Sequence, residues 1–284
     1  MPELPEVESV RRGLEAVIVG LTVTRVRLMR ADVVAGRRSA SALLLGATIA
    51  RVERHGKQLA LIANRDGRAP TLCFHLGMTG QLVVERAGAR NSARPHEHAR
   101  WTLAAGHDRE RRTINMVFRD PRRFGGVWTF DSDDALRCNR WCRLGPDALG
   151  AASPDDPSLA RLWRSARSIK SALLEQSLIA GVGNIYADEA LFRAAIRPRR
   201  RARALKPHER QALTQSLIAV LREAIEAGGS TLRDYQRVTG EPGSFQNRHR
   251  VYGRAGLACT VCGEKLRSAV VAQRTTVWCS ACQR

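Results

Sequence analysis

Four cysteines near the end of the chain have the spacing of a metal site. Cys259-x-x-Cys262 is followed, after sixteen residues, by Cys279-x-x-Cys282, and this spacing fits the zinc template of two paired knuckles. Each Cys-x-x-Cys turn directs two thiolates at one point, so two such turns complete a tetrahedron with no open position. A redox pair is the weaker interpretation, because redox Cys-x-x-Cys motifs belong to a βαβ setting. The pattern predicts one structural zinc ion.

The start of the chain carries a second set of reactive groups. Removal of Met1 in a cell would expose the secondary amine of Pro2. An α-amino group has a pKa of about 8, roughly 2 units below lysine, so part of it is unprotonated and nucleophilic at neutral pH. Glu3 is adjacent and Glu6 lies one helical turn further on, which supplies carboxylates for proton transfer. The alternative is an inert terminus, as most chain ends are.

Two predicted turns present a large apolar side chain. Residues 119–125 set Phe124 beside arginines that include Arg122, an arrangement suited to unstacking a base step. Met78, in the glycine-flanked turn at residues 75–80, is suited to the same task. The alternative for both side chains is a place in the hydrophobic core, where methionine commonly fills gaps.

Residues 178–187 break one predicted helix and start another. Gly181 and Gly183 permit tight turns, and Asn184 is a good helix N-cap. The helix that begins there would offer free N–H groups to an anion such as a DNA phosphate. A plain joint between two helices explains the glycines equally well.

The overall charge narrows the class of partner. The 284 residues contain 47 Lys+Arg against 27 Asp+Glu, a formal net charge of +20. Such a charge favours a polyanion, and nucleic acid first, although an arginine-biased genome would also raise it. The hydrophobic fraction of 44% is enough to fill real cores.

Cysteine usage and hydropathy indicate a compartment. Seven cysteines, an odd number, argue against a disulfide framework and favour a reducing environment. No apolar run approaches the ~20 residues of a membrane span, and the first residues lack the pattern of a signal or transit peptide. We therefore expect a cytoplasmic protein. The sequence assigns no role to Cys73, Cys138 and Cys142.

The elements that must position these groups begin with a helix, predicted over 5–19 by apolar residues at helical spacing. Short β-rich runs separated by glycine or polar turns then predict eight strands, which suggests a sandwich or barrel. The runs are 22–27, 48–52, 58–63, 71–75, 81–85, 100–104, 114–118 and 126–130.

Helical patterns dominate the second half of the chain. They cover 159–166, 169–177, 184–195 and 206–227, with a further short helix over 231–237. The cysteine tail then predicts a hairpin of strands 270–273 and 275–278 with Arg274 at its tip. The expected domains are 1–135, 150–235 and 250–284.

Five motifs occur together and in order. They are Met1-Pro2-Glu3-Leu4-Pro5-Glu6-Val7-Glu8, His75-Leu76-Gly77-Met78-Thr79-Gly80, Asp120-Pro121-Arg122-Arg123-Phe124-Gly125, Gly181-Val182-Gly183-Asn184-Ile185-Tyr186-Ala187 and the cysteine tail. With them the chain resembles the bacterial formamidopyrimidine-DNA glycosylases, or 8-oxoguanine DNA glycosylases, over essentially its whole length. The related endonuclease eight family has glycine in place of Leu4 and lacks the 75–80 motif, which favours the purine-lesion branch.

The resemblance implies an α+β fold: an N-terminal β-sandwich with a leading helix, a helix–two-turn–helix DNA-binding domain and a C-terminal zinc ribbon, with DNA in the cleft between the two halves. It implies a monomeric base-excision-repair enzyme that binds damaged double-stranded DNA in the bacterial nucleoid and has no membrane partner. The enzyme would remove 8-oxoguanine and formamidopyrimidines. It would then cleave the strand by β,δ-elimination through a Schiff base on the N-terminal proline. One structural Zn²⁺ is the implied cofactor.

The resemblance also implies roles for residues of this chain. Pro2 resembles the nucleophile and Glu3 the proton donor of the glycosylase step. Lys57 resembles the proton donor of β-elimination, and Arg274 the finger arginine of δ-elimination. The space left by the flipped nucleotide would be filled by Met78, Arg122 and Phe124. Glu6 would organise the pocket, and the other implied DNA contacts are His96, Arg164, Arg167, Lys170 and Asn184.

Two departures from the family pattern and two rival functions remain. The family often has a lysine-rich run before Lys170, where this chain has Arg164-Ser165-Ala166-Arg167-Ser168, so the phosphate ligand near Ser165 is open. The lesion-covering loop, placed around 237–250, is rich in arginine. The sequence therefore does not assign which oxidised purine the enzyme prefers. The rivals are a pyrimidine-preferring relative and a non-catalytic zinc-ribbon protein that binds DNA. The latter would need neither a free Pro2 amine nor Lys57.

Overall fold

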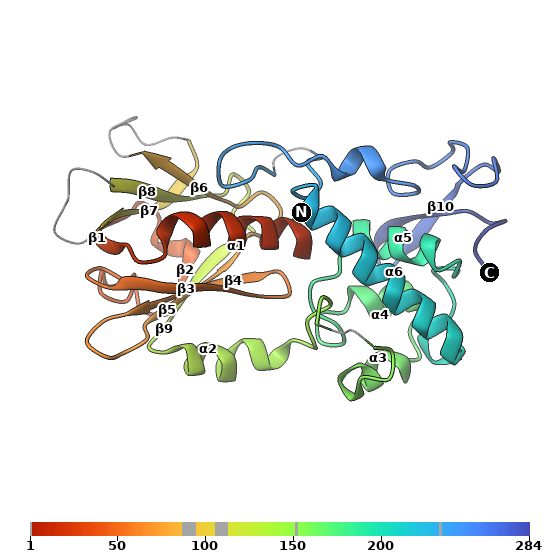
Figure 1. Ribbon diagram of the computed structural model, residues 1–284, viewed down its shortest axis with the longest axis horizontal. Coiled ribbons are helices and arrows are strands. Elements are labelled where there is room, and N and C mark those ends of the chain that lie inside the picture. Colours follow the sequence, from red (N-terminus) through yellow and green to blue (C-terminus); the bar gives the residue numbers. More distant parts are fainter. Residues whose placement is uncertain (1, 87–94, 106–112, 151–152, 233–234) are drawn as a thin grey trace. The chain divides into compact units, whose positions relative to one another are not determined.

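The chain forms two compact units. The computed structural model describes residues 2–86, 95–105, 113–150, 153–232 and 235–284, and Figure 1 labels its helices and strands. Unit 1 comprises Pro2, Glu6–Cys142 and Ser230–Gly243, and unit 2 comprises Glu3–Pro5, Arg143–Gly229 and Ser244–Arg284. Within the described residues, no helix combines the length and the apolarity that crossing a membrane requires.

Unit 1 is built on one hydrogen-bonded sheet in the strand order β2-β9-β5-β4-β3-β1-β7-β8-β6. All eight predicted strands are present, and β2 is an addition to them. Strand β7 begins three residues before the predicted strand, because its first residues are polar and do not show a β-rich pattern. The strands are β1 (Thr22–Leu28), β2 (Val34–Ala35), β3 (Thr48–His55), β4 (Gln58–Asn64), β5 (Thr71–His75), β6 (Gln81–Arg86), β7 (Glu97–Ala104), β8 (Thr113–Arg119) and β9 (Gly126–Phe130).

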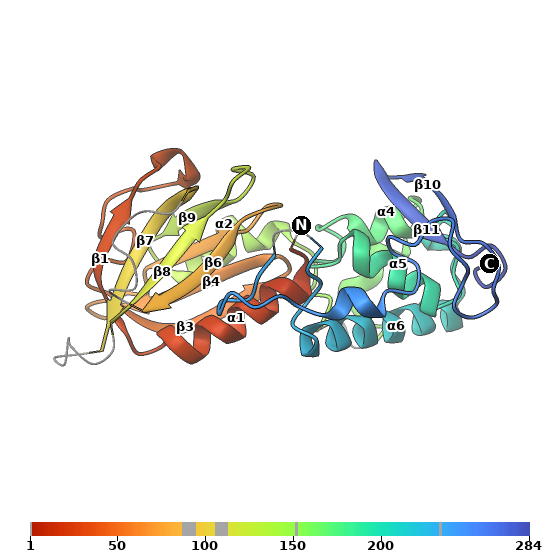
Figure 2. The same ribbon diagram turned by 90° about the horizontal axis from the view of Figure 1, so that it is seen from above.

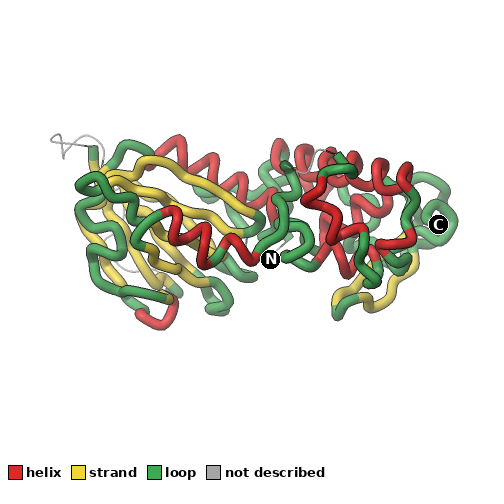
Figure 3. The backbone as a smooth tube through the Cα atoms, turned by 90° about the horizontal axis from the view of Figure 1, so that it is seen from below, coloured by secondary structure: helices red, strands yellow, loops and turns green. Residues whose placement is uncertain are grey.

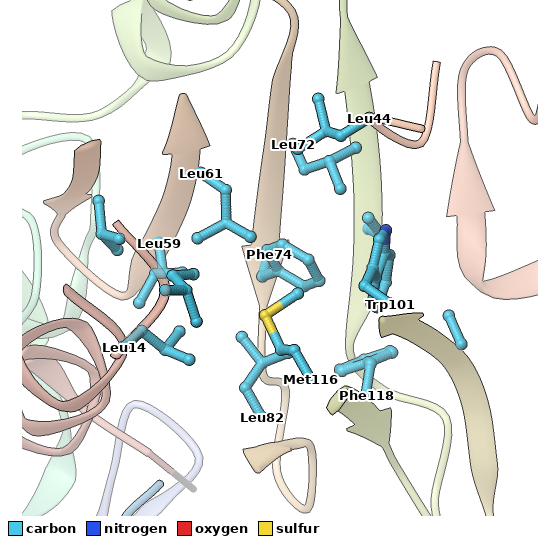
Figure 4. Packing of buried hydrophobic residues seen from close by; sticks show 14 of the residues in the cluster. Leu14, Leu44, Leu59, Leu61, Leu72, Phe74, Leu82, Trp101, Met116 and Phe118 are labelled. Carbon is cyan, nitrogen blue, oxygen red and sulfur yellow. The ribbon is translucent and has the colours of Figure 1, made fainter. Parts of the chain in front are cut away.

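This sheet folds into two layers at the junction of β1 and β3. The two strands are paired only at Thr22 and Thr48, and both ladders carry a register shift next to the junction. Phe74 of β5 packs against Trp101 of β7, with ring centroids 5.7 Å apart, and against Phe118 of β8 at 6.0 Å (Figure 4). Since these rings come from opposite halves of the sheet, the core lies between two layers, as the predicted sandwich requires.

Two helices belong mainly to unit 1. In α1 (Leu4–Ile18) the residues Val7, Val10 and Leu14 are at most 1% exposed and belong to the sandwich core, as their helical spacing predicts. The fourth residue of the predicted pattern, Val17, is 41% exposed, and the neighbouring Ile18 is buried in its place. Figure 2 shows α1 beside the strands. Helix α2 (Asp133–Asn139) was not predicted from the sequence, although Ser132 caps it by accepting a hydrogen bond from the N–H of residue 135.

Unit 2 is made mostly of helices and loops, with one hairpin (Figure 3). Its helices are α3 (Ala160–Trp163), α4 (Ile169–Leu174), α5 (Asn184–Arg193) and α6 (Pro207–Glu226), and its hairpin strands are β10 (Arg267–Val271) and β11 (Arg274–Trp278). The predicted helix over 231–237 is wrong for the residues described there, which form no helix. Short 3₁₀ turns complete the two units: Ala31–Val33, Trp141–Arg143, Pro157–Leu159, Ala202–Ala204 and Phe245–Arg248.

Candidate active site and metal centre

The carboxylate of Glu3 lies at the N-terminus of α5. Its oxygens accept hydrogen bonds from the N–H of Ile185 at 3.0 Å and of Tyr186 at 3.4 Å, and the residue is only 3% exposed. The first N–H groups of a helix have no partner within the helix and carry partial positive charge, so they attract a carboxylate. Although Glu3 is near the end of the chain, the helix therefore holds its side chain in one place.

Two glycines make room for this approach. Gly181 has a φ of +106°, and a Cβ there would lie 2.4 Å from Cδ1 of Leu4. A Cβ at Gly183 would lie 2.2 Å from Cδ of Glu3. The backbone N–H of Leu4 donates to the carbonyl of Gly181 at 3.1 Å. The glycine motif therefore lets residues 3 and 4 pack directly on the turn before α5.

These contacts correct the prediction that the N–H groups at the start of this helix bind a DNA phosphate. The N–H groups of Ile185 and Tyr186 donate to Glu3, so at these two positions the helix already holds an anion from its own chain. Gly183, and not Asn184, occupies the N-cap position. The Asn184 side chain instead donates to the carbonyl of Thr275 at 3.0 Å.

Lys57 sits in the two-residue turn between β3 and β4. Gly56 supplies the left-handed conformation of this turn, with a φ of +57°, as a tight hairpin requires. Arg54 fixes the turn, because it donates to the carbonyl of Gly56 and to the carboxylate of Glu8, both at 3.0 Å. Burial would raise the pKa of Glu8, but hydrogen bonds from three arginines outweigh it and hold the pKa below its ordinary value. Lys57 itself is 8% exposed.

Pro2 and Glu6 are both buried residues of unit 1. The carboxylate of Glu6 accepts a hydrogen bond from the N–H of Ser230 at 2.7 Å, and its carbonyl accepts one from the hydroxyl of Tyr235 at 3.2 Å. Burial, and then the charge of Glu6, raises the pKa of Tyr235. Glu6 thus ties α1 to Ser230–Gly243, and its side chain is buried and not exposed to a DNA partner. Met1 lies outside the described residues.

The side chains expected to fill a gap in the base stack are exposed. Met78 is 36% exposed and Phe124 is 56% exposed, so neither takes the core position that was the alternative. The guanidinium carbon of Arg122 lies 4.7 Å from the centroid of the Phe124 ring. Among the other expected DNA contacts, His96 is also exposed in unit 1, and Arg164 and Arg167 are exposed in unit 2.

The turn that carries Met78 should lose stability in acid. Burial, and then the charges of Arg140 and Lys57, lowers the pKa of His75 to about 4, and its Nδ1 accepts the N–H of Gly77 at 3.3 Å. An unfolded histidine titrates near pH ~6.5, so the unfolded chain binds more protons between pH ~4 and ~6.5. The free energy of unfolding should therefore rise with pH across this window, by up to about 3 kcal/mol. Urea unfolding of wild type and His75→Asn at several pH values checks this; equal pH slopes would contradict it.

Lys170 departs from its expected role as a DNA contact. It is fully buried, and its ammonium lies 2.7 Å from the carboxylate of Asp188 and donates to the hydroxyl of Thr276 at 2.7 Å. Burial, opposed by the charge of Lys170, raises the pKa of Asp188 to about 6. A phosphate would have to displace these partners to reach the ammonium. The structure therefore corrects the expectation to a buried pair that joins α4, α5 and β11.

Two buried carboxylates of α5, those of Asp188 and Glu189, were not predicted from the sequence. Asp188 accepts the N–H of Val277 in β11 at 3.1 Å. Glu189 accepts the N–H groups of three successive residues, 250–252, at 2.9 to 3.0 Å. Both residues are 0% exposed. They anchor the C-terminal hairpin and the segment before it to α5. The sequence contains one indication of these buried carboxylates, namely two adjacent acidic residues directly after the apolar residues of the first helical turn.

The four cysteines of the tail form one cluster. Their Sγ atoms all lie within 4.8 Å of one another, with 3.9 Å between Cys259 and Cys282 and 3.5 Å between Cys262 and Cys279. Tetrahedral coordination at a Zn–S distance of about 2.3 Å separates neighbouring sulfurs by about 3.8 Å. The donor set and the spacing therefore fit a bound metal ion whose coordination positions are all filled by protein.

Arg274 lies beside the tip of the hairpin. The two-residue turn is formed by Ala272 and Gln273, with φ of +50° and +58°, and Arg274 pairs with Val271 as the first residue of β11. The predicted tip position was wrong, because β10 ends at Val271 and not at Gln273, so the turn falls on the two residues before Arg274. Arg274 is exposed.

Replacing Cys279 by serine should remove the bound metal and unfold the hairpin region. Cys279 is fully buried, and a region this small depends on its metal for folding free energy. We expect metal content to fall to near zero and amide exchange in β10 and β11 to become fast. The exposed Cys138→Ser is the matched control. DNA binding that stays at the wild-type level without metal would contradict the structural role.

Comparison with known proteins gives the same picture over the whole chain. Residues 1–127 match the family model described as the formamidopyrimidine-DNA glycosylase N-terminal domain, and residues 144–236 match its H2TH domain. The formamidopyrimidine-DNA glycosylase of Thermus thermophilus is 44% identical over 285 residues, covering 100% of this chain and 98% of the relative.

Solved structures agree with the sequence relatives. The crystal structure of the MutM (Fpg) protein from Thermus thermophilus superposes with a TM-score of 0.80 at 41% identity, over 99% of this chain and 98% of that one. The Lactococcus lactis Fpg in complex with DNA containing N7-benzyl-Fapy-dG gives a TM-score of 0.83 at 32% identity, over all of both chains.

The sandwich, the H2TH helices and the cysteine cluster together define a base-excision DNA glycosylase of the class that also has AP lyase activity. The chain belongs to the formamidopyrimidine-DNA glycosylase family.

Proposed function

We propose that this enzyme removes oxidised purines, 8-oxoguanine and formamidopyrimidines, from double-stranded DNA and then cleaves the strand by β,δ-elimination. The observation that carries the proposal is the buried carboxylate of Glu3 on the N-terminus of α5. Because Pro2 is bonded directly to Glu3, the same anchor restrains the amine that would act as nucleophile. An acid next to a secondary amine suits base release coupled to formation of an iminium ion.

In the proposed reaction the nitrogen of processed Pro2 bonds to C1′ as the bond from C1′ to the base breaks. The sugar ring opens to an iminium ion, with Glu3 as the proton donor of this step. Water takes up a C2′ proton that the iminium ion makes acidic, a C2′–C3′ double bond forms, and the 3′ phosphate leaves with the electrons of its C3′–O bond; Lys57 is assigned as the proton donor of this β-elimination. A second elimination, assigned to Arg274, removes the C4′ proton to water and expels the 5′ phosphate with the electrons of its C5′–O bond. Addition of water to the iminium ion then releases the sugar remnant as an aldehyde and returns the free amine of Pro2.

DNA binding is proposed for the exposed basic side chains, with Met78, Arg122 and Phe124 filling the space of the extruded nucleotide. Extrusion costs a few kcal/mol, and side chains that replace the lost stacking offset part of that cost. Affinity should fall steeply with salt, as for any protein that neutralises phosphates. The other contacts are assigned to His96, Arg164, Arg167 and Asn184.

The metal of the cysteine cluster is proposed to be one structural Zn²⁺, held by Cys259, Cys262, Cys279 and Cys282. The ion supplies no reactive position, because four thiolates complete its coordination. A chromosomal DNA substrate assigns the enzyme to the bacterial cytoplasm, and the proposed domains are 1–135, 150–235 and 250–284.

Borohydride trapping tests the proposed chemistry. Protein confirmed by mass spectrometry to begin at Pro2 should form a covalent adduct with a duplex that contains an abasic site, because borohydride reduces the iminium to a stable amine. Pro2→Gly should trap far less, and protein that keeps Met1 should trap none. Absence of an adduct from the processed wild type would overturn the lyase assignment. Comparing release of 8-oxoguanine opposite cytosine with release of thymine glycol tests the purine preference.

A further inference from the structure

The two loops with exposed apolar tips lie against each other in unit 1. A Cβ added at Gly77 would lie 2.4 Å from both the carbonyl carbon of Phe124 and the backbone nitrogen of Gly125. The turn at 75–80 and the loop at 120–125 therefore touch through their backbones. Because Met78 and Phe124 are solvent-exposed, packing of these side chains does not explain what holds the loops together.

The carboxylate of Asp120 supplies that connection. Asp120 is 0% exposed. One of its oxygens accepts the hydroxyl of Thr79, the residue after Met78, and the other accepts the N–H of Gly125 at 2.7 Å. A buried carboxylate is stable only when such donors surround it, and hydrogen bonds to a charged acceptor are stronger than neutral ones.

Thr79 completes the link in the other direction. Its hydroxyl oxygen accepts the N–H of Arg122 at 3.2 Å, and the same N–H also approaches Oδ1 of Asp120 at 3.3 Å. One hydroxyl thus donates to Asp120 and accepts from Arg122, so it connects the turn that holds Met78 to the loop that holds Phe124.

The backbone of Asp120 is in turn fixed to the sheet. Its N–H donates to the carbonyl of His96 at 3.2 Å, and its carbonyl oxygen lies 2.8 Å from Nε2 of His98. His98 belongs to β7 and is 4% exposed. The connection therefore runs from a rigid strand through one carboxylate to both exposed tips.

We propose that Asp120 and Thr79 are positioning residues that lock Met78, Arg122 and Phe124 into one preorganised wedge. The inference rests on the proposed function, since it assumes that these three side chains enter the space of the extruded nucleotide. A wedge held in place before DNA arrives does not lose loop entropy on insertion. Without the lock, each tip would have to be ordered separately during base extrusion.

The test compares two substrates that differ in the need for a wedge. One carries 8-oxoguanine paired with cytosine in a full duplex, and the other carries it in an unpaired bulge, where extrusion costs least. Thr79→Val keeps the shape of the side chain and removes the hydroxyl. It should lower kcat/KM on the duplex by about tenfold, the effect of losing hydrogen bonds to a charged group, and leave the bulge substrate nearly unchanged.

Three further variants make the result specific. Thr79→Ser restores the hydroxyl and should restore the duplex rate, whereas Asp120→Asn should behave like Thr79→Val. In the double variant Thr79→Val with Phe124→Ala, the loss should be no larger than for Phe124→Ala alone, because both changes disable the same wedge. Thermal unfolding of each variant reports any general loss of structure. Such a loss would lower kcat/KM on both substrates equally.

The possible outcomes separate the inference from the proposed function. If Phe124→Ala does not change the ratio of duplex to bulge activity, the wedge itself is overturned. If Phe124→Ala changes the ratio but Thr79→Val and Asp120→Asn do not, the positioning role is overturned and the wedge stands. If Thr79→Val and Asp120→Asn lower kcat/KM equally on the duplex and the bulge substrate, the positioning role is also overturned.

Discussion

Replacing Glu3 by glutamine is expected to lower base excision by about 10²–10⁴-fold, the usual contribution of a positioned acid. Glutamine has nearly the same shape, and its amide oxygen can still accept the N–H of Ile185 that now donates to the carboxylate. The fold should therefore survive while the proton donor is lost. Single-turnover release of 8-oxoguanine measures the effect. Strand cleavage at a preformed abasic site should fall much less, because the base has already left.

The control for this variant is the same change at an exposed position of α1, the helix that begins directly after Glu3. Glu15 lies on α1 with a side chain 49% exposed and pairs with Arg11 at 2.7 Å. Exposed pairs of this kind contribute little, so Glu15→Gln should match wild type. If Glu3→Gln excises 8-oxoguanine within about twofold of the wild-type rate, the assignment of Glu3 as proton donor fails.

The strands were the most predictable part of the fold. The predicted bounds of β5 and β9 agree with the structure, because both strands are short β-rich runs between turn residues. The start of β7 was missed because Glu97 and His98 are polar, yet they are 6% and 4% exposed. The carboxylate of Glu97 pairs with Arg100 at 2.6 Å. Such pairing depends on tertiary contacts that no local pattern displays.

In the candidate site, too, the features that depend on local sequence could be predicted, and those that depend on tertiary contacts could not. The types and spacing of the reactive groups predicted the cysteine cluster, whose four sulfurs do meet. They did not reveal that Glu3 supplies the anion at the N-terminus of α5, because this contact joins residues 182 positions apart. For the same reason Asn184 seemed the natural N-cap. A capping side chain next to the helix is not needed where a carboxylate from a distant part of the chain already accepts hydrogen bonds from the free N–H groups of the helix N-terminus.

Replacing Gly183 by alanine is expected to disable Glu3 without touching it chemically. The new Cβ would lie 2.2 Å from Cδ and 2.5 Å from Oε1 of Glu3, far inside van der Waals contact, so the carboxylate must move by about 1 Å. A displacement of that size costs about 100-fold in rate. We expect single-turnover base excision to fall by about that factor, while the metal content stays at the wild-type level.

A second change can separate displacement of Glu3 from general damage. Glu3→Asp shortens the side chain by one methylene, so in the Gly183→Ala background it should recover part of the lost excision, although alone it should lower activity. Gly150→Ala is the matched control in the same unit, since its Cβ would meet only the carbonyl of Asp147 at 3.5 Å, an ordinary contact distance. A Gly183→Ala enzyme with the wild-type excision rate would mean that the position of Glu3 does not limit catalysis. The anchor on α5 would then be a feature of folding alone.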